Sequence, residues 1–438
     1  MNYTINEVLQ FAKENDVKFI RLSFCDIFGT LKNISILADE LPRAFESGIS
    51  FDASSIKGFM NVEESDLFLF PDPTTLSILP WRPQQGSVVR LFCNIKHPDG
   101  RPFDGDGRNI LQNAVCTAQE LGYEIEIGTE CEFYLFEKDE KGNPTLTPHD
   151  KATYLDVAPL DKGENVRRDI CLTLEQMGIL PESSHHEQGP GQNEICFKYS
   201  DAKNAADNLI TFKSVVKAIA HINGLHASFM PKPLKNFSGS GLHINMSLLK
   251  NNINLFNKEF NHTEDADNFL AGILSRIPEM TLFMNPLTNS YKRFGSHSAP
   301  KYVTWSPQNR SQLIRIPAAS GKYSRIELRS SDPSCNPYLV FALLIYSGLD
   351  GIKNKTLLEK PANLNLYKAD EYTVKNFKPI PGSLEEAINL ANDSDFIKNH
   401  LPAEVINKFI AAKKDEYCQY LSSKDKEEFD LNNYFYCV

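Results

Sequence analysis

Four short stretches of this chain alternate chelating polar residues with apolar residues, and this feature constrains the fold more than any other. Alternation with a period of two places successive side chains on opposite faces of a β-strand. The stretches are Glu130–Leu135, Gln192–Phe197, His243–Leu248 and Arg325–Arg329. An ordinary half-buried strand has a mixed solvated face, whereas carboxylate, histidine and arginine recur here in four places. The pattern predicts a sheet whose concave face carries a metal and anion site.

The overall composition indicates a soluble globular protein. The hydrophobic content is 41%, the charged content is 23%, and 438 residues allow two or three domains. The net charge of −10 argues against nucleic acid as the main partner, because phosphate binding favours a basic surface. It still permits a small anionic substrate held by a few local arginines.

The sequence also predicts a cytoplasmic protein with no membrane segment. No apolar run approaches the length of about 18 residues that a spanning helix needs, and the N-terminus lacks the pattern of a signal peptide. The nine cysteines include no Cys-x-x-Cys pair, which is typical of reduced thiols. Two of them, Cys131 and Cys196, are expected on apolar strand faces, where they would be structural.

The chain divides into a small first domain and a larger second one. A helical spacing at residues 5–15 precedes strand-like runs at 18–24, 31–36 and 87–95, and the domain ends near the turn 97–100. The second domain alternates helices with strands and then becomes helical towards residue 438. The expected helices are 107–121, 164–178, 202–223, 337–349, 384–392 and 402–421. We expect Gly351 to cap the helix that starts at Pro337.

Six candidate metal ligands lie on or beside the polar strand faces. They are Glu130, Glu132, Glu187, Glu194, His243 and Glu327. Five carboxylates that converge on one cavity repel one another unless cations neutralise them. Oxygen ligands with one imidazole suit Mg²⁺ or Mn²⁺. Any one of these glutamates alone is more simply a surface residue, but four polar-faced strands together favour the metal site.

Cationic residues are dense in the same part of the chain. They are Arg293, Arg310, Arg315, Lys322, Arg325 and Arg329. Guanidinium groups beside a divalent ion suit phosphoryl transfer, because negative charge spreads over the phosphoryl oxygens in the transition state. A basic surface stripe is the alternative. The P-loop pattern is absent, so that type of nucleotide site is excluded. Chemistry alone therefore predicts a metal-dependent enzyme that handles ATP and a carboxylate substrate.

Seven motifs carry a resemblance to a known family. They are FDASSIKGF at 51–59, GTECEFYLF at 128–136, HHEQGPGQNEI at 185–195, GSGLHINMSL at 239–248, NPLTNSYKR at 285–293, NRSQLIRIP at 309–317 and RIELRSSDPSCNPYL at 325–339. In this order the motifs resemble type I glutamine synthetase over nearly the whole chain.

The resemblance implies an α+β fold with two domains. A small N-terminal β-grasp domain over residues 1–98 would precede a catalytic domain over 105–438, built on a curved antiparallel sheet flanked by helices. It also implies a dodecamer of two stacked hexameric rings, with each active site between neighbouring subunits.

The implied reaction is the ATP-dependent ligation of ammonia to the γ-carboxylate of L-glutamate through γ-glutamyl phosphate, which gives glutamine, ADP and phosphate. Two divalent ions, Mg²⁺ or Mn²⁺, would serve each active site. The resemblance assigns one ion to Glu132, Glu187 and Glu194. It assigns the other to Glu130, His243 and Glu327.

The remaining site residues follow from the same motifs. Gly239, Arg293 and Arg329 match the glutamate-binding positions, and Arg310 and Arg315 match those that stabilise the phosphoryl group. Glu182, Ser247, Lys322 and Arg325 match nucleotide contacts. Asp52 and Ser55 of the adjacent subunit match the ammonium pocket together with Tyr154, and Asp52 would act there as a general base.

The chain departs from the family pattern at three positions. Ser298 stands where the flap carries a glutamate that closes over the site, and serine cannot act as a carboxylate. Ser238 replaces an asparagine that touches glutamate, and Asn245 replaces a second histidine. Two other functions therefore stay open: a γ-glutamyl ligase for a larger amine, and a catalytically weakened homologue with a regulatory role.

Overall fold

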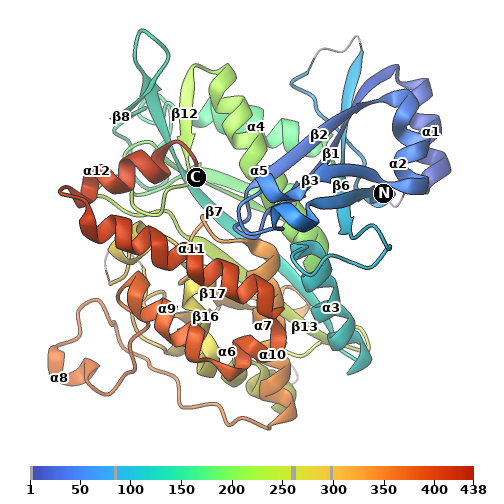
Figure 1. Ribbon diagram of the computed structural model, residues 1–438. Coiled ribbons are helices and arrows are strands. Elements are labelled where there is room, and N and C mark those ends of the chain that lie inside the picture. Colours follow the sequence, from blue (N-terminus) through green and yellow to red (C-terminus); the bar gives the residue numbers. More distant parts are fainter. Residues whose placement is uncertain (1–2, 83–85, 258–262, 296–298) are drawn as a thin grey trace.

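The computed structural model describes residues 3–82, 86–257, 263–295 and 299–438. The predicted flap residue Ser298 lies outside the described residues. Figure 1 shows a small N-terminal lobe, in blue, beside a larger lobe in which the long strand β7 crosses the centre of the view. In the part of the chain that the structure describes, no helix is both long enough and apolar enough to cross a membrane.

The N-terminal lobe is a mixed sheet with two helices. Its elements are α1 (Ile5–Glu14), β1 (Val17–Cys25), β2 (Leu31–Leu37), α2 (Leu41–Ser47), β3 (Ile49–Asp52), β4 (Asp66–Pro71), β5 (Ser77–Ile78) and β6 (Ser87–Lys96). The strand order is β2-β1-β6-β4-β3, with β5 paired to β6. Strands β1 and β6 are parallel and the other pairs are antiparallel. Helix α1 begins with a capping box between Thr4 and Glu7.

The larger lobe is built on a second sheet with the order β15-β16-β17-β13-β7-β10-β9. Its strands are β7 (Glu124–Lys138), β8 (Pro144–Pro148), β9 (Pro181–His186), β10 (Gln192–Phe197), β11 (Ser200–Asp201), β12 (Leu225–Ser228), β13 (Leu242–Lys250), β14 (Ile253–Asn254), β15 (Trp305–Pro307), β16 (Ile314–Ile316) and β17 (Ile326–Leu328). The pairs are antiparallel as expected, except that β15 runs parallel to β16 at the edge.

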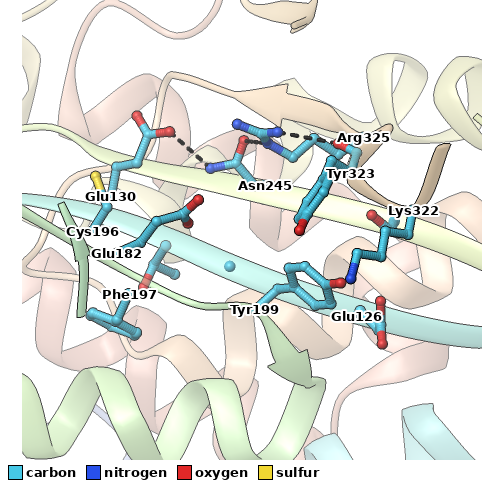
Figure 2. Close-up of a pocket in the computed structure, with 13 residues that line it drawn as sticks. Glu126, Glu130, Glu182, Cys196, Phe197, Tyr199, Asn245, Lys322, Tyr323 and Arg325 are labelled. Carbon is cyan, nitrogen blue, oxygen red and sulfur yellow. Dashed lines mark hydrogen bonds between the residues drawn. The ribbon is translucent and has the colours of Figure 1, made fainter. Parts of the chain in front are cut away.

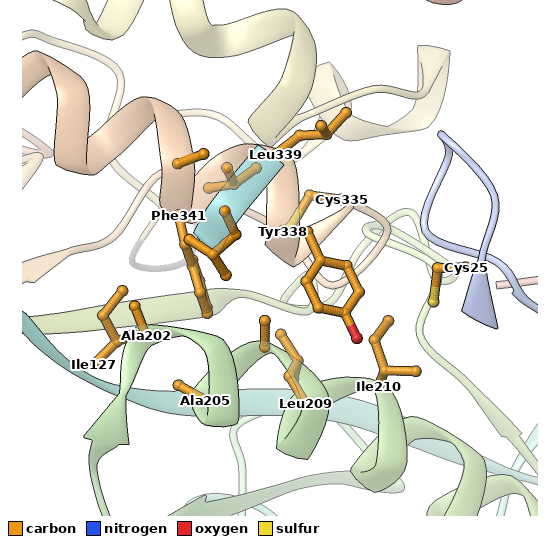
Figure 3. Packing of buried hydrophobic residues seen from close by; sticks show 14 of the residues in the cluster. Cys25, Ile127, Ala202, Ala205, Leu209, Ile210, Cys335, Tyr338, Leu339 and Phe341 are labelled. Carbon is orange, nitrogen blue, oxygen red and sulfur yellow. The ribbon is translucent and has the colours of Figure 1, made fainter. Parts of the chain in front are cut away.

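Helices complete the larger lobe. They are α3 (Gly107–Glu120), α4 (Glu164–Gln176), α5 (Ala202–Ile222), α6 (Glu264–Met284), α7 (Pro337–Lys353), α8 (Glu371–Val374), α9 (Leu384–Asp393), α10 (Asp395–His400), α11 (Ala403–Ser422) and α12 (Lys426–Asp430). Figure 3 shows side chains of α5 and α7 packed together against Ile127 of β7. Cys25 of β1 joins the same cluster, so the two lobes share one hydrophobic core.

The expected end of α7 is wrong. We expected Gly351 to cap the helix, but α7 continues to Lys353 and Gly351 is buried inside it. A Cβ atom on Gly351 would lie 2.1 Å from the carbonyl oxygen of Asn268 and 2.7 Å from the Cα atom of Gly272 in α6. The glycine is therefore needed for close packing of α6 against α7, which is a tertiary requirement that local sequence does not reveal.

Candidate functional site

Strand register brings the predicted ligands together on one face of the second sheet. His243 of β13 lies opposite Glu130 of β7, and Glu194 of β10 lies opposite Glu132 of the same strand. Directly opposed residues in an antiparallel pair have Cβ atoms about 5 Å apart, which is close enough for two side chains to share one ion. On the other face of β7, Cys131 and Phe133 are fully buried in the core.

Three ligand groups result from this register. Within each group, the candidate ligand atoms all lie within 4.8 Å of one another. The first group is Glu130, His243 and Glu327; the second is Glu132, Glu194 and His243; the third is His185, Glu187 and Glu194. The first is the set that the resemblance assigned to one ion. The other assigned set, Glu132, Glu187 and Glu194, is spread over the two groups that share Glu194.

His185 is a member of the site that the sequence-based prediction missed. Its Nε2 atom lies 3.1 Å from Oε1 of Glu187 and 3.9 Å from Oε1 of Glu194. Alternation along β9 supplies part of the signal, because it separates His185 from His186, but the pairing of β9 with β10 is needed to show which of them meets Glu194. Adjacent histidines on a strand face opposite ways, and His185 is the one that pairs directly with Glu194.

The carboxylates of this cluster differ in charge stabilisation. Burial raises the pKa of Glu194 well above its ordinary value, and the neighbouring Glu132, Glu130 and Glu187 raise it further. Burial also raises the pKa of Glu130, but hydrogen bonds from His243 and Asn245 outweigh it and hold this pKa at about 2. The ionised form is thus stabilised at Glu130 and destabilised at Glu194.

Crowded carboxylates whose ionised form needs a countercharge fit a site for divalent cations. Oxygen and imidazole donors that are buried together, with a carboxylate pKa raised by its neighbours, are the surroundings in which a bound cation lowers the free energy. The donor set is rich in carboxylate oxygen, which suits Mg²⁺ or Mn²⁺.

Two arginines form ion pairs with Glu327, one with each carboxylate oxygen. Nη2 of Arg315 lies 2.6 Å from Oε2 of Glu327, and Nη1 of Arg329 lies 2.6 Å from Oε1. The pKa of Arg315 is lowered by burial and further by Arg310, although Glu327 opposes this shift. Arg310 is exposed, and its carbonyl accepts a hydrogen bond of 3.3 Å from the Tyr367 hydroxyl. Three cationic groups therefore gather at one side of the ligand cluster.

Arg293 lies beside Arg329, to whose carbonyl its Nη2 atom donates at 3.1 Å, and against the glycine loop 238–241. Its Nη1 atom donates to the carbonyl of Ser330 at 2.8 Å. A Cβ atom on Gly239 would lie 2.4 Å from the carbonyl oxygen of Pro231 and 2.9 Å from Cγ of Arg293. A Cβ atom on Gly241 would lie 2.8 Å from Nη2 of the same arginine and 3.1 Å from Nε2 of His243. Only glycine allows this close approach of loop, arginine and ligand.

A polar pocket opens beside Glu130. It is lined by Glu126, Gly128, Thr129, Glu130, Glu182, Cys196, Phe197, Tyr199, Asn245, Ser247, Lys322, Tyr323 and Arg325. All four predicted nucleotide contacts, Glu182, Ser247, Lys322 and Arg325, are among them. Figure 2 shows the amide of Asn245 between Glu130 and Arg325, to which it bonds at 3.1 and 2.9 Å. The aromatic rings of Tyr199 and Tyr323 complete a wall suited to a planar base.

Comparison with known proteins agrees with this geometry. The family described as "Glutamine synthetase, beta-Grasp domain" matches residues 16–98, and "Glutamine synthetase, catalytic domain" matches residues 104–434. The chain belongs to the glutamine synthetase family.

Individual relatives cover nearly the whole chain. The glutamine synthetase of Clostridium saccharobutylicum is 48% identical over 440 residues, covering 99% of this chain and 98% of the relative. That of Methanosarcina mazei is 47% identical over 423 residues, with 95% of each chain covered. A solved GmaS/ADP complex superposes with a TM-score of 0.87 at 28% identity and covers 98% of both chains.

Of the ammonium-pocket residues expected from the glutamine synthetase family, two lie in the N-terminal lobe and one lies beside the ligand cluster. Asp52 and Ser55 belong to the N-terminal lobe, where Oδ2 of Asp52 accepts from the Ser55 hydroxyl at 2.9 Å. Hydrogen bonds from Ser54 and Ser55 lower the pKa of Asp52, so this exposed group is an anion at neutral pH. Tyr154 is nearer to the cluster, since its ring packs edge-on against His185 with the centroids 5.6 Å apart.

The expected position of Cys196 is wrong. We expected it on an apolar face, but its Sγ atom lies 3.2 Å from Oε1 of Glu194 and it lines the polar pocket. Strand alternation explains this, because residues two apart share a face and Glu194 is a ligand candidate. Burial and the neighbouring Glu194 raise the thiol pKa, so Cys196 is neutral beside the site.

Proposed function

We propose that this chain catalyses ATP-dependent ligation of ammonia to the γ-carboxylate of L-glutamate, through γ-glutamyl phosphate, with glutamine, ADP and phosphate as products. The reaction belongs to glutamine biosynthesis in nitrogen metabolism. The observation that carries the proposal is the register of β7, β10, β13 and β17, which gathers carboxylates and a histidine between a polar pocket and a set of arginines.

Two divalent ions, Mg²⁺ or Mn²⁺, would be held by the six predicted ligands. Glu130, His243 and Glu327 form one set. Glu132, Glu187 and Glu194 form the other, for which His185 is an additional candidate. When bound, the ions neutralise the crowded carboxylates and the charge of the transferred phosphoryl group.

The arginines would bind the acidic substrate and the transferred group. Arg293 and Arg329, with the backbone of Gly239, would hold the glutamate carboxylates, since guanidinium groups match carboxylates in geometry and charge. Arg310 and Arg315 would face the phosphoryl oxygens as negative charge spreads over them. The substrate carboxylate becomes reactive once phosphorylation gives its oxygen a good leaving group.

The pocket beside Glu130 would hold ATP through Glu182, Ser247, Lys322 and Arg325. The relative solved with ADP supports a nucleotide site on this fold. Lys322 and Arg325 bring positive charge, and Tyr199 and Tyr323 bring aromatic surface.

Asp52 and Ser55 of an adjacent subunit, with Tyr154, would form the ammonium pocket. An ionised Asp52 attracts the cation and accepts its proton, which exposes the nucleophilic lone pair. This arrangement requires an oligomer, for which we propose a dodecamer of two hexameric rings in the cytoplasm. We also propose the division into a domain of residues 1–98 and one of 105–438.

The deciding experiment measures glutamine formation that depends on ATP, ammonium and a divalent ion. Product at saturating Mg²⁺ or Mn²⁺ supports the proposal, and no product with either ion rejects it. The same assay with larger amines tests the alternative acceptor. A Ser298→Glu variant tests the flap: more glutamine formed per ATP consumed is expected if a carboxylate shields the acyl phosphate from water.

A further inference from the structure

Gln192 stands between a candidate metal ligand and the glycine loop 238–241. It is the first residue of β10 and is fully buried, at 0% exposure. Its Nε2 atom donates to Oε2 of Glu132 at 3.0 Å and to the carbonyl oxygen of Gly239 at 3.1 Å. One amide thus uses both of its N–H groups to join the ligand cluster to the loop.

The orientation of this amide is fixed by its surroundings. Oε1 of Gln192 accepts from the backbone N–H of Gly189 at 2.9 Å. A flipped amide would present its oxygen to two other oxygen acceptors, which is unfavourable. The Tyr134 hydroxyl lies 3.5 Å from Oε1 of Gln192 and donates to the carbonyl of Ser238 at 2.5 Å. Tyr134 therefore anchors the loop at Ser238, the residue before Gly239.

The loop is also tied directly to the ligand. The backbone N–H of Gly241 donates to Oε2 of Glu132 at 2.8 Å, and the Glu132 N–H donates to the carbonyl of Gly241 at 3.1 Å. Oε2 of Glu132 therefore receives two hydrogen bonds from the protein. Oε1 of the same carboxylate lies 3.9 Å from Nε2 of His243, on the side where a cation would be bound.

We propose that Gln192 is a positioning residue that couples cation binding at Glu132 to the placement of the glutamate-binding loop. The inference rests on the proposed function. A cation that fixes Glu132 also fixes the amide, and the amide fixes the carbonyl of Gly239. Linkage makes the effect reciprocal, so glutamate tightens cation binding by the same factor as the cation tightens glutamate binding.

The test compares full-length wild type with Gln192→Leu and a matched control, Asn193→Leu. Asn193 is a buried amide on the same strand, but it faces the other way and accepts from Arg167 at 2.6 Å. Titration calorimetry measures Mn²⁺ affinity with and without saturating L-glutamate, in the absence of ATP. The ratio of the two dissociation constants is the coupling factor.

We expect a coupling factor of about 5 or more for wild type and Asn193→Leu, within the usual range for linked sites. For Gln192→Leu we expect a coupling factor well below that of wild type, because only the direct bond from Gly241 to Glu132 remains. We also expect Mn²⁺ affinity lowered by about 10- to 100-fold, as for other residues that orient a metal ligand. A folded Gln192→Leu protein with the wild-type factor overturns the inference. Wild type that binds neither Mn²⁺ nor glutamate overturns the proposed function instead.

A second measurement needs no variant. Hydrogen exchange of the Ser240 and Gly241 amides in wild type is expected to slow when Mn²⁺ alone is added, because Gly241 bonds directly to Glu132. Exchange that stays the same at saturating Mn²⁺ contradicts the coupling, whether or not the variants fold.

Discussion

Two buried clusters of this molecule have similar ligand geometry and opposite electrostatics. One contains Glu132, Glu194 and His243, and the other contains Asp150, Asp161 and His186. In each, two acidic groups and one imidazole offer atoms within 4.8 Å of one another. Proximity of acidic residues and histidine therefore does not by itself separate a cation site from a structural network.

The second cluster already has its countercharges. Nη2 of Arg167 lies 2.5 Å from Oδ2 of Asp161, and Nε2 of His186 lies 2.9 Å from Oδ1 of Asp150. Burial would raise the pKa of Asp150, but hydrogen bonds from His186 and the Gly191 N–H outweigh it and hold this pKa at about 2. Nothing in this cluster calls for an added cation.

The first cluster lacks that compensation at Glu194, whose pKa is raised by burial and by other carboxylates. The two clusters contain the same kinds of ligand, so ligand identity does not distinguish the functional one. What distinguishes it is the charge of the groups next to each carboxylate: cationic beside Asp150 and Asp161, but anionic beside Glu194. The adjacent residues His185 and His186 illustrate this, since strand alternation sends one to each cluster.

The largest expected effect is on folding, through Asp161→Ala. The change leaves the buried Arg167 without its carboxylate, which typically costs about 3–5 kcal/mol. Urea unfolding measures the loss. Mn²⁺ affinity of the folded variant should equal that of wild type. A large fall in Mn²⁺ affinity at unchanged stability would contradict the assignment of this cluster as structural.

Glu132→Gln should have the opposite effect, with activity lost and stability of the fold kept. Loss of a ligand carboxylate is expected to lower ATP-dependent glutamine formation by about 100-fold or more, since changes to residues behind the ligands already cost about 10- to 100-fold. Stability of the metal-free protein should not fall, because one of several repelling charges is removed. The exposed Glu175→Gln serves as control, and wild-type activity in Glu132→Gln would exclude this residue from the site.

Acid should weaken the structural cluster through Asp150. Its pKa is about 2 in the folded protein against an ordinary value of 3.8. A lowered carboxyl pKa stabilises the fold above the unfolded value, and the contribution of about 2 kcal/mol is lost as the pH falls from about 4 to 2. Urea unfolding across this range should show a steeper pH dependence for wild type than for Asp150→Asn. Equal slopes would show that Asp150 does not contribute to the pH dependence of stability.

The smallest expected effect is a gain in stability from Glu194→Gln. Because the pKa of Glu194 is raised in the folded state, its contribution to stability is present below the ordinary value of 4.5 and is lost as the pH rises. At neutral pH the metal-free variant should therefore have the higher melting temperature. Addition of Mn²⁺ should reverse this order, and a lower melting temperature without metal would contradict the proposed crowding.

Much of the fold and site was predictable from local pattern and family motifs. Period-two alternation placed Glu130 and Glu132 on one face, and the motifs supplied the β-grasp and catalytic domains, which the family matches support. What local pattern does not contain is register. Only the pairing of β9 with β10 shows that His185 meets Glu194.

The two wrong predictions have different origins. Cys196 was assigned by its apolar character, although its position two residues from Glu194 decides its face. Gly351 was assigned as a cap from local helix rules, although contact with Gly272 decides its role. The first signal is local to β10, whereas the second is a constraint from another part of the chain.

The contact between α6 and α7 has a practical consequence for engineering. Replacing a helical glycine by alanine is a common way to gain about 0.5–1 kcal/mol. At Gly272 and Gly351 the added methyl group would meet backbone atoms at 2.2 and 2.1 Å. A thermostabilisation campaign should leave both positions unmutated, because the helices would have to separate to admit the new group.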